Sequence, residues 1–166
     1  MNSTFIPKTI LLAAFAMLLP SARLPAAENL ADTIEMVRAT YRTDREAFLK
    51  ESMQLTESES TVFWPLYRSY RADIEKLGDG LVKLVLEYAD AYPNIPEDRA
   101  EEMLKNYTTL EGKLVQKRAQ YLKRAAKSLP ASKVLRWAQL ENRMDLGLRL
   151  QLAGTLPLVP SSQPKQ

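Results

Sequence analysis

A regular spacing of apolar side chains between residues 55 and 92 constrains the fold more than any other feature of the sequence. Apolar or aromatic residues recur there at alternating steps of four and three, at Phe63, Tyr67, Tyr70, Ile74, Leu77, Leu81, Leu84 and Tyr88. This spacing is typical of one long helix that packs against other helices. The pattern therefore predicts an all-α protein organised around a central helix over 57–91.

Both ends of this helix carry boundary signals. Leu55, Thr56 and Glu59 form a T-x-x-E capping box with an apolar residue before the cap. Two prolines and an asparagine within residues 92–96 predict a rigid turn at the other end. A helix of this length would span roughly 50 Å at 1.5 Å per residue. A chain of this size cannot wrap such a rod into a ball, which leaves an elongated helical hairpin or a homodimer.

Three residues inside the central helix have low helix propensity. Pro65 predicts a kink near the third turn. Gly78 and Gly80 each cost about 1 kcal/mol relative to alanine. The apolar positions nevertheless keep their phase across both glycines, so we expect one uninterrupted helix in which these glycines have no special geometry.

Similar spacing predicts three further helices, over 29–52, 97–128 and 131–153, and so an elongated bundle of about four. In the first, the expected outer face includes Arg38, Arg42 and Arg45. The expected inward residues of the three helices are Leu30, Ile34, Val37, Tyr41 and Phe48; Met103, Tyr107, Leu110, Leu114, Tyr121 and Ala125; and Val134, Trp137, Leu140, Met144, Leu148 and Leu152.

The N-terminal 27 residues are typical of a signal peptide. Lys8 precedes a ten-residue apolar run, Ile10 to Leu19, which is shorter than the roughly 20 residues of a membrane span. We expect cleavage after Ala26 or Ala27, with Ala22 and an uncleaved anchor as alternatives. The predicted organisation is a signal peptide (1–27), an all-helical domain (28–160) whose last residues lie extended over a bundle end, and a disordered tail (161–166). The predicted location is the periplasm, without stable membrane insertion after signal removal.

The chain contains no cysteine and no histidine. It therefore lacks the commonest catalytic nucleophile–base pairs and nearly all zinc or copper ligands. Its carboxylates are scattered along polar helix faces, so we expect neither an enzyme nor a metal or other cofactor, and a carboxylate-only enzyme remains a distant alternative.

Charge is distributed unevenly along the sequence. Residues 28–112 carry ten basic and 18 acidic side chains, whereas residues 113–150 carry ten basic ones and only two acidic ones, Glu141 and Asp145. This asymmetry predicts electrostatic matching between the halves of the chain or between two subunits. No base-reading motif accompanies the basic segment, so nucleic acid is not an expected partner.

Two sets of side chains are candidates for binding other polypeptides, either unfolded clients or one envelope protein. Aromatic residues could provide anchors, and basic residues could capture partners electrostatically. Both sets have an ordinary interpretation, as helix core and as solvated surface. Of the aromatic residues, Trp64 lies one position off the apolar spacing and is expected to be the most exposed. The candidates are Trp64, Tyr67, Tyr70, Lys117, Arg118, Lys123, Arg124 and Lys127.

The motif LTESE at residues 55–59 opens a long helix in a cysteine-free, all-helical chain with an export signal. It resembles the LTxxQ element of the Spy/CpxP-like periplasmic proteins, with Glu59 where that family usually has glutamine. The longer pattern, LTESESTVFWPLYRSY followed by KLGDGLVKLV and RWAQLENRMDLGLRLQLAGTLPLV, is also similar to a group of uncharacterised exported proteobacterial proteins.

The first resemblance implies an elongated helical dimer that holds partly folded clients without ATP, or an envelope-stress-associated protein. The alternative is a non-catalytic adaptor or structural protein with one dedicated envelope partner. The range of proteins bound separates the two functions, because a chaperone suppresses aggregation of unrelated clients and an adaptor does not.

Overall fold

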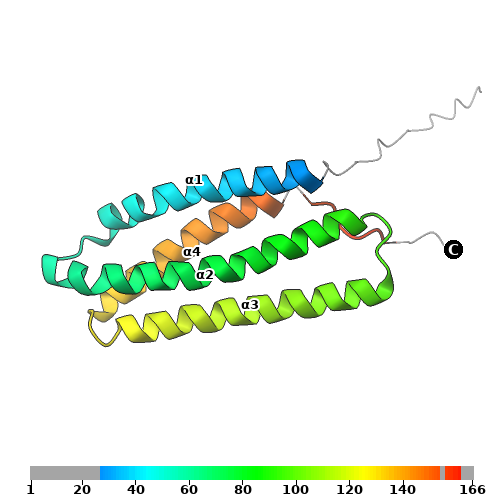
Figure 1. The fold of residues 1–166 in the computed structure, drawn as a ribbon. Helices are drawn as coiled ribbons and strands as arrows, with labels where there is room; N and C mark the ends of the chain where they lie inside the picture. Colours follow the sequence, from blue (N-terminus) through cyan, green and yellow to red (C-terminus); the bar gives the residue numbers. More distant parts are fainter. Residues whose placement is uncertain (1–26, 154–155, 162–166) are drawn as a thin grey trace, which may run out of the picture.

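The computed structural model describes residues 27–153 and 156–161, and within these ranges all regular structure is helical. Four helices, α1 (Ala27–Met53), α2 (Glu57–Ala91), α3 (Glu97–Ala125) and α4 (Ala131–Ala153), run lengthwise in alternating directions and form an elongated bundle (Figure 1). The prediction of an all-α, four-helix bundle with one long central helix is confirmed. The predicted signal peptide, apart from Ala27, and the predicted tail after Ser161 lie outside the described residues.

The boundaries of α2 agree with the prediction because both of its end signals operate. The backbone N–H of Glu59 donates to Thr56 Oγ1 at 3.3 Å, and the backbone N–H of Thr56 donates to the Glu59 carboxylate at 2.8 Å. Helix α3 ends at Ala125, earlier than the predicted residue 128. The chain turns there so that Leu129, 6% exposed, enters the core directly before Pro130.

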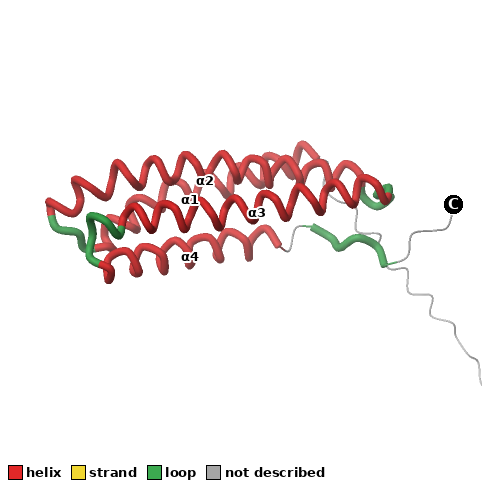
Figure 2. The backbone as a smooth tube through the Cα atoms, turned by 90° about the horizontal axis from the view of Figure 1, so that it is seen from below, coloured by secondary structure: helices red, strands yellow, loops and turns green. Residues whose placement is uncertain are grey.

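The core lies towards the end of the bundle that holds the α1–α2 and α3–α4 connections (Figures 1 and 2). Trp137 is its centre, with the rings of Phe63 and Tyr70 edge-on to its own at centroid distances of 5.4 and 5.2 Å. Its buried members are Leu49, Met53, Phe63, Tyr67, Tyr70, Ile74, Leu114, Tyr121, Ala125, Leu129, Trp137 and Leu140.

The regularly spaced apolar residues of α2 therefore lie in two different environments. Its first four positions, Phe63 to Ile74, are buried in the core. The remaining four, from Leu77 to Tyr88, are only partly buried. At this far end, Tyr88 Oη donates a hydrogen bond of 2.8 Å to the carbonyl oxygen of Pro157. The segment 156–161 contains no helix and, as predicted, lies across this end of the bundle (Figure 1).

The predicted register of α1 was wrong in its second half. Phe48, expected to face inward, is 41% exposed, whereas Leu49 and Met53 are fully buried. Arg45, expected on the solvated face, is only 4% exposed. From Tyr41 onward the buried face advances by steps of four, and ion pairs with α4 allow a charged residue to occupy one of its positions.

The inward positions of α3 and α4 follow the prediction in the core and depart from it at the far end. Leu114, Tyr121, Ala125, Trp137 and Leu140 are buried as predicted. Tyr107 is 47% exposed, because the neighbouring helices leave an opening at its level. The side chain of Leu152 is not among those that the structure describes.

Helix α2 packs most extensively against α3, and α1 packs against α4, whereas contact between α3 and α4 is the sparsest of the neighbouring pairs. This sparse contact leaves space between α3 and α4. Among the described residues, none of the helices combines the length and apolar character that a membrane crossing requires.

Candidate functional site: a cavity between the four helices

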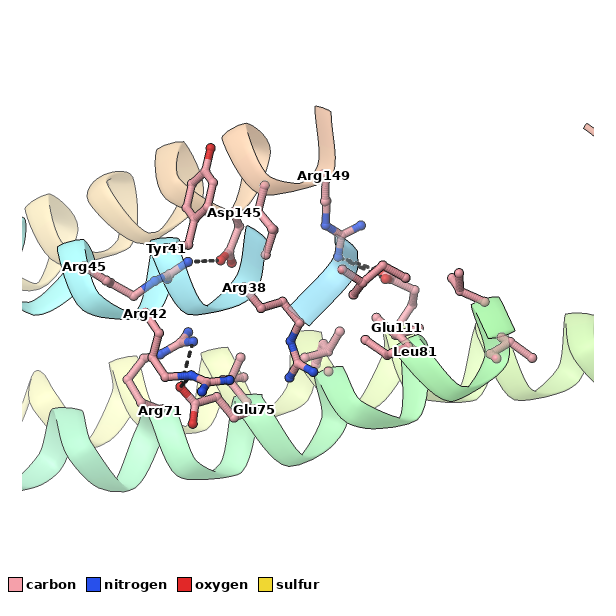
Figure 3. Close-up of a pocket in the computed structure, with 18 of the residues that line it drawn as sticks. Arg38, Tyr41, Arg42, Arg45, Arg71, Glu75, Leu81, Glu111, Asp145 and Arg149 are labelled. Carbon is pink, nitrogen blue, oxygen red and sulfur yellow. Dashed lines mark hydrogen bonds and ion pairs between the residues drawn. The ribbon is translucent and has the colours of Figure 1, made fainter. Parts of the chain in front are cut away.

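A cavity of about 490 Å³ lies among the four helices, beyond the core. Figure 3 shows side chains from α1, α2, α3 and α4 converging on it, and Leu156 of the C-terminal segment also lines it. Three lining residues are exposed at its rim: Arg42, Tyr107 and Arg149. A space of this volume is within the range of about 300–1,000 Å³ that small-molecule sites occupy.

Much of the wall is apolar. Helix α2 supplies most of it, and α1, α3 and α4 complete it. Gly78 belongs to the same wall, and a Cβ added to it would have Arg38 Nη2 as its nearest neighbour, at 3.6 Å. The principal aliphatic residues are Ile34, Ile74, Leu81, Val82, Leu84, Val85, Leu114 and Leu148.

The polar part of the lining is rich in arginine. It contains the six arginines Arg38, Arg42, Arg45, Arg71, Arg118 and Arg149, but only the three carboxylates Glu75, Glu111 and Asp145. The lining therefore has three more arginines than carboxylates, and three carboxylates outside it, Glu35, Asp79 and Glu141, pair with these arginines.

These arginines differ in how closely a carboxylate accompanies them. Arg149 donates to Glu111 at 3.0 Å, and Arg38 donates to Asp79 at 2.6 Å. Arg42 and Arg71 share Glu75 at longer separations of 3.6 and 3.5 Å. Arg42 also contacts Glu35 at 3.3 Å and Arg71 contacts Glu141 at 3.7 Å, so these two arginines are paired at longer distances than Arg38 and Arg149 are.

A buried charge cluster separates the cavity from the core. Arg45 on α1 contacts Glu141 at 2.8 Å and Asp145 at 2.9 Å, both on α4. Arg118 on α3 also pairs with Asp145, and Tyr67 Oη on α2 donates to Glu141 at 3.3 Å. The cluster therefore joins all four helices at one level.

Burial governs the protonation of this cluster. Desolvation raises the pKa of the Glu141 carboxyl, against the opposing effect of Arg45 and Arg71. Desolvation, assisted by the charge of Glu141, also raises the pKa of Tyr67 well above its ordinary value, so its hydroxyl stays protonated and available as a donor.

A second cavity, of about 190 Å³, lies between α3 and α4 on the core side of the cluster. Leu122, Trp137 and Ala138 line it, and it shares Arg118 and Asp145 with the larger cavity. The two cavities therefore lie one after the other along the space between α3 and α4. We call this feature the α3–α4 groove and define it by Tyr107, Glu111, Arg118 and Leu122 on α3 and Trp137, Ala138, Asp145 and Arg149 on α4.

The aromatic candidates from the sequence lie mainly in the core. Tyr67 and Tyr70 are each 2% exposed. Trp64 is half-buried, with its ring edge-on to those of Phe63 and Tyr67 at centroid distances of 5.1 and 5.7 Å. The structure brings these three rings together as packing, on the opposite side of the charge cluster from the larger cavity.

The basic candidates divide into two groups. Lys117 donates to Asp73 at 2.9 Å, and this hydrogen bond, together with one from Tyr121, lowers the pKa of the Asp73 carboxyl. Arg118 joins the buried cluster. Lys123, Arg124 and Lys127 are exposed near the end of α3, where the Arg124 guanidinium lies 4.9 Å from the centroid of the Tyr121 ring.

Sequence reasoning missed the roles of Arg45 and Glu141. A signal was present for each. Arg45 lies four residues after Tyr41 and four before Leu49, on the face that those residues define. Glu141 and Asp145 are the only acidic residues of the basic segment, and their spacing of four places them on one face of a helix.

The predicted matching between an acidic and a basic half describes only part of the ion pairing. Lys117–Asp73 and Arg149–Glu111 follow it. The buried pairs reverse it, because Arg45 and Arg71 come from the acidic half while Glu141 and Asp145 come from the basic one.

Guanidinium groups and carboxylates form most of the polar part of the site. Its carboxylates are held by guanidinium groups, and within the described residues no three carboxylates gather as a metal ion requires. Comparison with protein-family models, with curated proteins and with solved structures finds no match for this chain.

Proposed function

We propose that this chain is a non-catalytic helical binding protein that holds apolar segments of other polypeptides, in the manner of an ATP-independent Spy/CpxP-like chaperone. The observation that carries the proposal is a set of exposed apolar side chains beside the α3–α4 groove. They are Leu104 and Val115 on α3, 64% and 61% exposed, and Leu146 and Leu150 on α4, 57% and 79% exposed.

Helix geometry places these residues at the rim of the groove. Leu104, Glu111 and Val115 fall on one stripe of α3, since they are separated by seven and four residues. Glu111 contacts Arg149 across the groove at 3.0 Å. Leu146 and Leu150 lie on the same side of Arg149, roughly 60° and 100° around α4 from it. An apolar rim around arginine–carboxylate pairs suits an amphipathic segment, which would lay its apolar face along the groove.

The ion pairs that cross the groove support a second function, that of an adaptor for one dedicated envelope partner. The pairs Arg118–Asp145 and Arg149–Glu111 bridge α3 and α4 at two levels. They cross-link the two helices and so fix the shape of the groove, which favours one complementary partner over many. A periplasmic location, as the sequence of residues 1–27 predicts, belongs to both proposals, and N-terminal sequencing of protein from a periplasmic extract would test it.

Aggregation assays separate the two functions. Purified protein without nucleotide or metal should slow aggregation of at least two unrelated unfolded substrates. The double variant Leu104→Gln/Leu150→Gln should lose most of this protection, because it removes apolar contact from both sides of the groove. Met36→Gln is the matched control, since Met36 on α1 is 71% exposed.

Protection of neither substrate at several-fold excess would exclude the chaperone and leave the adaptor. Equal protection by the double variant and by the control would keep the activity and exclude the groove.

A further inference from the structure

The larger cavity has properties that polypeptide binding at the groove rim does not explain. All four helices and Leu156 contribute to its lining, so it is a deep pocket that opens to solvent at its rim and not a flat surface. Protein interiors are packed with few voids larger than a water molecule. A space of about 490 Å³ with mostly aliphatic walls is far larger than such packing leaves unfilled.

We propose that this cavity is a binding site for a small anionic amphiphile with one alkyl chain, of the alkyl carboxylate class. The alkyl chain lies against the aliphatic residues of α2 and α4, among them Leu81, Val85 and Leu148. The carboxylate lies at the α1–α2 wall, beside Arg42 and Arg71. This proposal is independent of the polypeptide-binding function.

Guanidinium donors that are left without a close acceptor select an anionic headgroup. Six arginines and three carboxylates line the cavity. Arg42 lies 3.3 Å from Glu35 and 3.6 Å from Glu75, and Arg71 lies 3.5 Å from Glu75, so neither has a carboxylate as close as the 2.8 Å between Arg45 and Glu141. Arg71 Nη1 is buried and makes no hydrogen bond, with its nearest carboxylate, Glu141, at 3.7 Å. A guanidinium presents several donors in a planar fork that matches a carboxylate. Both guanidinium groups therefore keep donors for a further acceptor, and Figure 3 shows Arg42, Arg71 and Glu75 gathered at this part of the cavity.

The shape of the cavity selects a narrow chain. The bulk of a folded partner is excluded because Leu156 and four helices contribute to the wall. Arg42 at the rim has a side chain that is 48% exposed, so a headgroup there keeps part of its hydration while the chain enters the apolar interior. The cavity is aliphatic inside and has arginines at its rim, an arrangement that matches the apolar chain and the anionic headgroup of a single-chain carboxylate.

Calorimetric titration with three ligands of equal chain length tests the headgroup. Decanoate should bind saturably, decanol more weakly, and decyltrimethylammonium most weakly. Arg42→Gln should weaken decanoate binding by about tenfold or more, as loss of a charge-assisted hydrogen bond does, and leave decanol binding unchanged. Arg143→Gln, at an exposed position of α4 outside the cavity, is the matched control and should change neither.

Filling the cavity tests the location. Val85→Phe should abolish decanoate binding, while Val62→Phe, the same substitution at an exposed site on α2 outside the cavity, should preserve it. A decanoate bearing a diazirine on its chain gives a readout on the unsubstituted protein and should label residues 81–85 or 145–149.

Several results would overturn the proposal: no saturable decanoate binding, equal affinity for decyltrimethylammonium, undiminished binding by a folded Val85→Phe variant, or labelling confined to other residues. A failure of aggregation suppression would leave it standing, because that assay addresses the groove rim.

Discussion

Arg45 on the first helix and Glu141 on the last form a buried ion pair, with a separation of 2.8 Å and side chains that are 4% and 5% exposed. Removing two charges from water costs several kcal/mol per ion, and only good geometry with further hydrogen bonds offsets this cost. Here Asp145, Arg71 and Tyr67 surround the pair. The pair is therefore part of a network that fixes how α1 and α4 meet.

Replacing one member of this pair should be far more harmful than replacing both. Arg45→Met leaves the Glu141 carboxylate buried beside Arg71 at 3.7 Å, and the free energy of unfolding should fall by about 3–5 kcal/mol. The double variant Arg45→Met/Glu141→Leu should lose clearly less than the sum of the two single variants. Urea unfolding of all four proteins measures this coupling, and strict additivity would contradict the network.

The raised pKa of Glu141 makes its contribution to stability depend on pH. The ordinary value for this carboxyl is 4.5, and desolvation raises it in the folded state. The folded protein then binds this proton more tightly than the unfolded chain does, so the contribution is full below the ordinary value and is lost as pH rises through the raised one. The stability advantage of the natural protein over Glu141→Gln should shrink over this window. An advantage that grows with pH would mean that Arg45 and Arg71 outweigh desolvation.

The two glycines of α2 should respond differently to alanine. A Cβ at Gly78 would make only an ordinary contact, 3.6 Å from Arg38 Nη2, so Gly78→Ala should stabilise by about 0.5–1 kcal/mol. A Cβ at Gly80 would lie 2.9 Å from Leu110 Cδ2 on α3. Gly80→Ala should therefore stabilise the protein less than Gly78→Ala does, or should destabilise it. Combination with Leu110→Ala should relieve the clash. Thermal unfolding of the variants measures these changes in stability. Equal increases in stability at both positions would show that no close approach exists at Gly80.

Truncations along α2 should reveal the difference between the core and the cavity. Phe63 is fully buried, and Phe63→Ala should cost about 3–5 kcal/mol. Leu84 is half-buried at the cavity wall, and Leu84→Ala should cost only about 1 kcal/mol because much of its surface is already uncovered. Chemical denaturation compares the two variants. A cost at Leu84 equal to that at Phe63 would mean that the far end is packed as tightly as the core.

The extent of α2 could be predicted from the sequence because its signals are local. The Thr56–Glu59 box and the prolines after Tyr92 act within one or two turns, and the apolar spacing persists across Gly78 and Gly80. The close approach at Gly80 could not be predicted, since it depends on where Leu110 of α3 crosses. The expectation that both glycines lack special geometry thus agrees with the structure at Gly78 and is wrong at Gly80.

The candidate site was harder to predict from the sequence, because it too depends on contacts between helices that are distant in the sequence. A buried arginine is identified by its partner, and the partner of Arg45 lies 96 residues away. The cavity arises because α3 and α4 diverge beyond the charge cluster, and helix divergence leaves no periodic signature. The positions of Tyr67 and Tyr70, by contrast, follow from spacing alone, which favoured core over surface.

Contact between the first and last helices has a consequence for how the protein is assembled during synthesis. Helices α2 and α3 are joined by the short turn at 92–96 and can pair as soon as both have left the ribosome. Helix α1, although it is made first, gains its main neighbour only when α4 follows. Contacts between residues so distant in sequence form late, because closure of a long loop is entropically unfavourable. A nascent chain therefore exposes the apolar face of α1 through most of its translation, which makes this helix the segment most in need of protection before folding is complete.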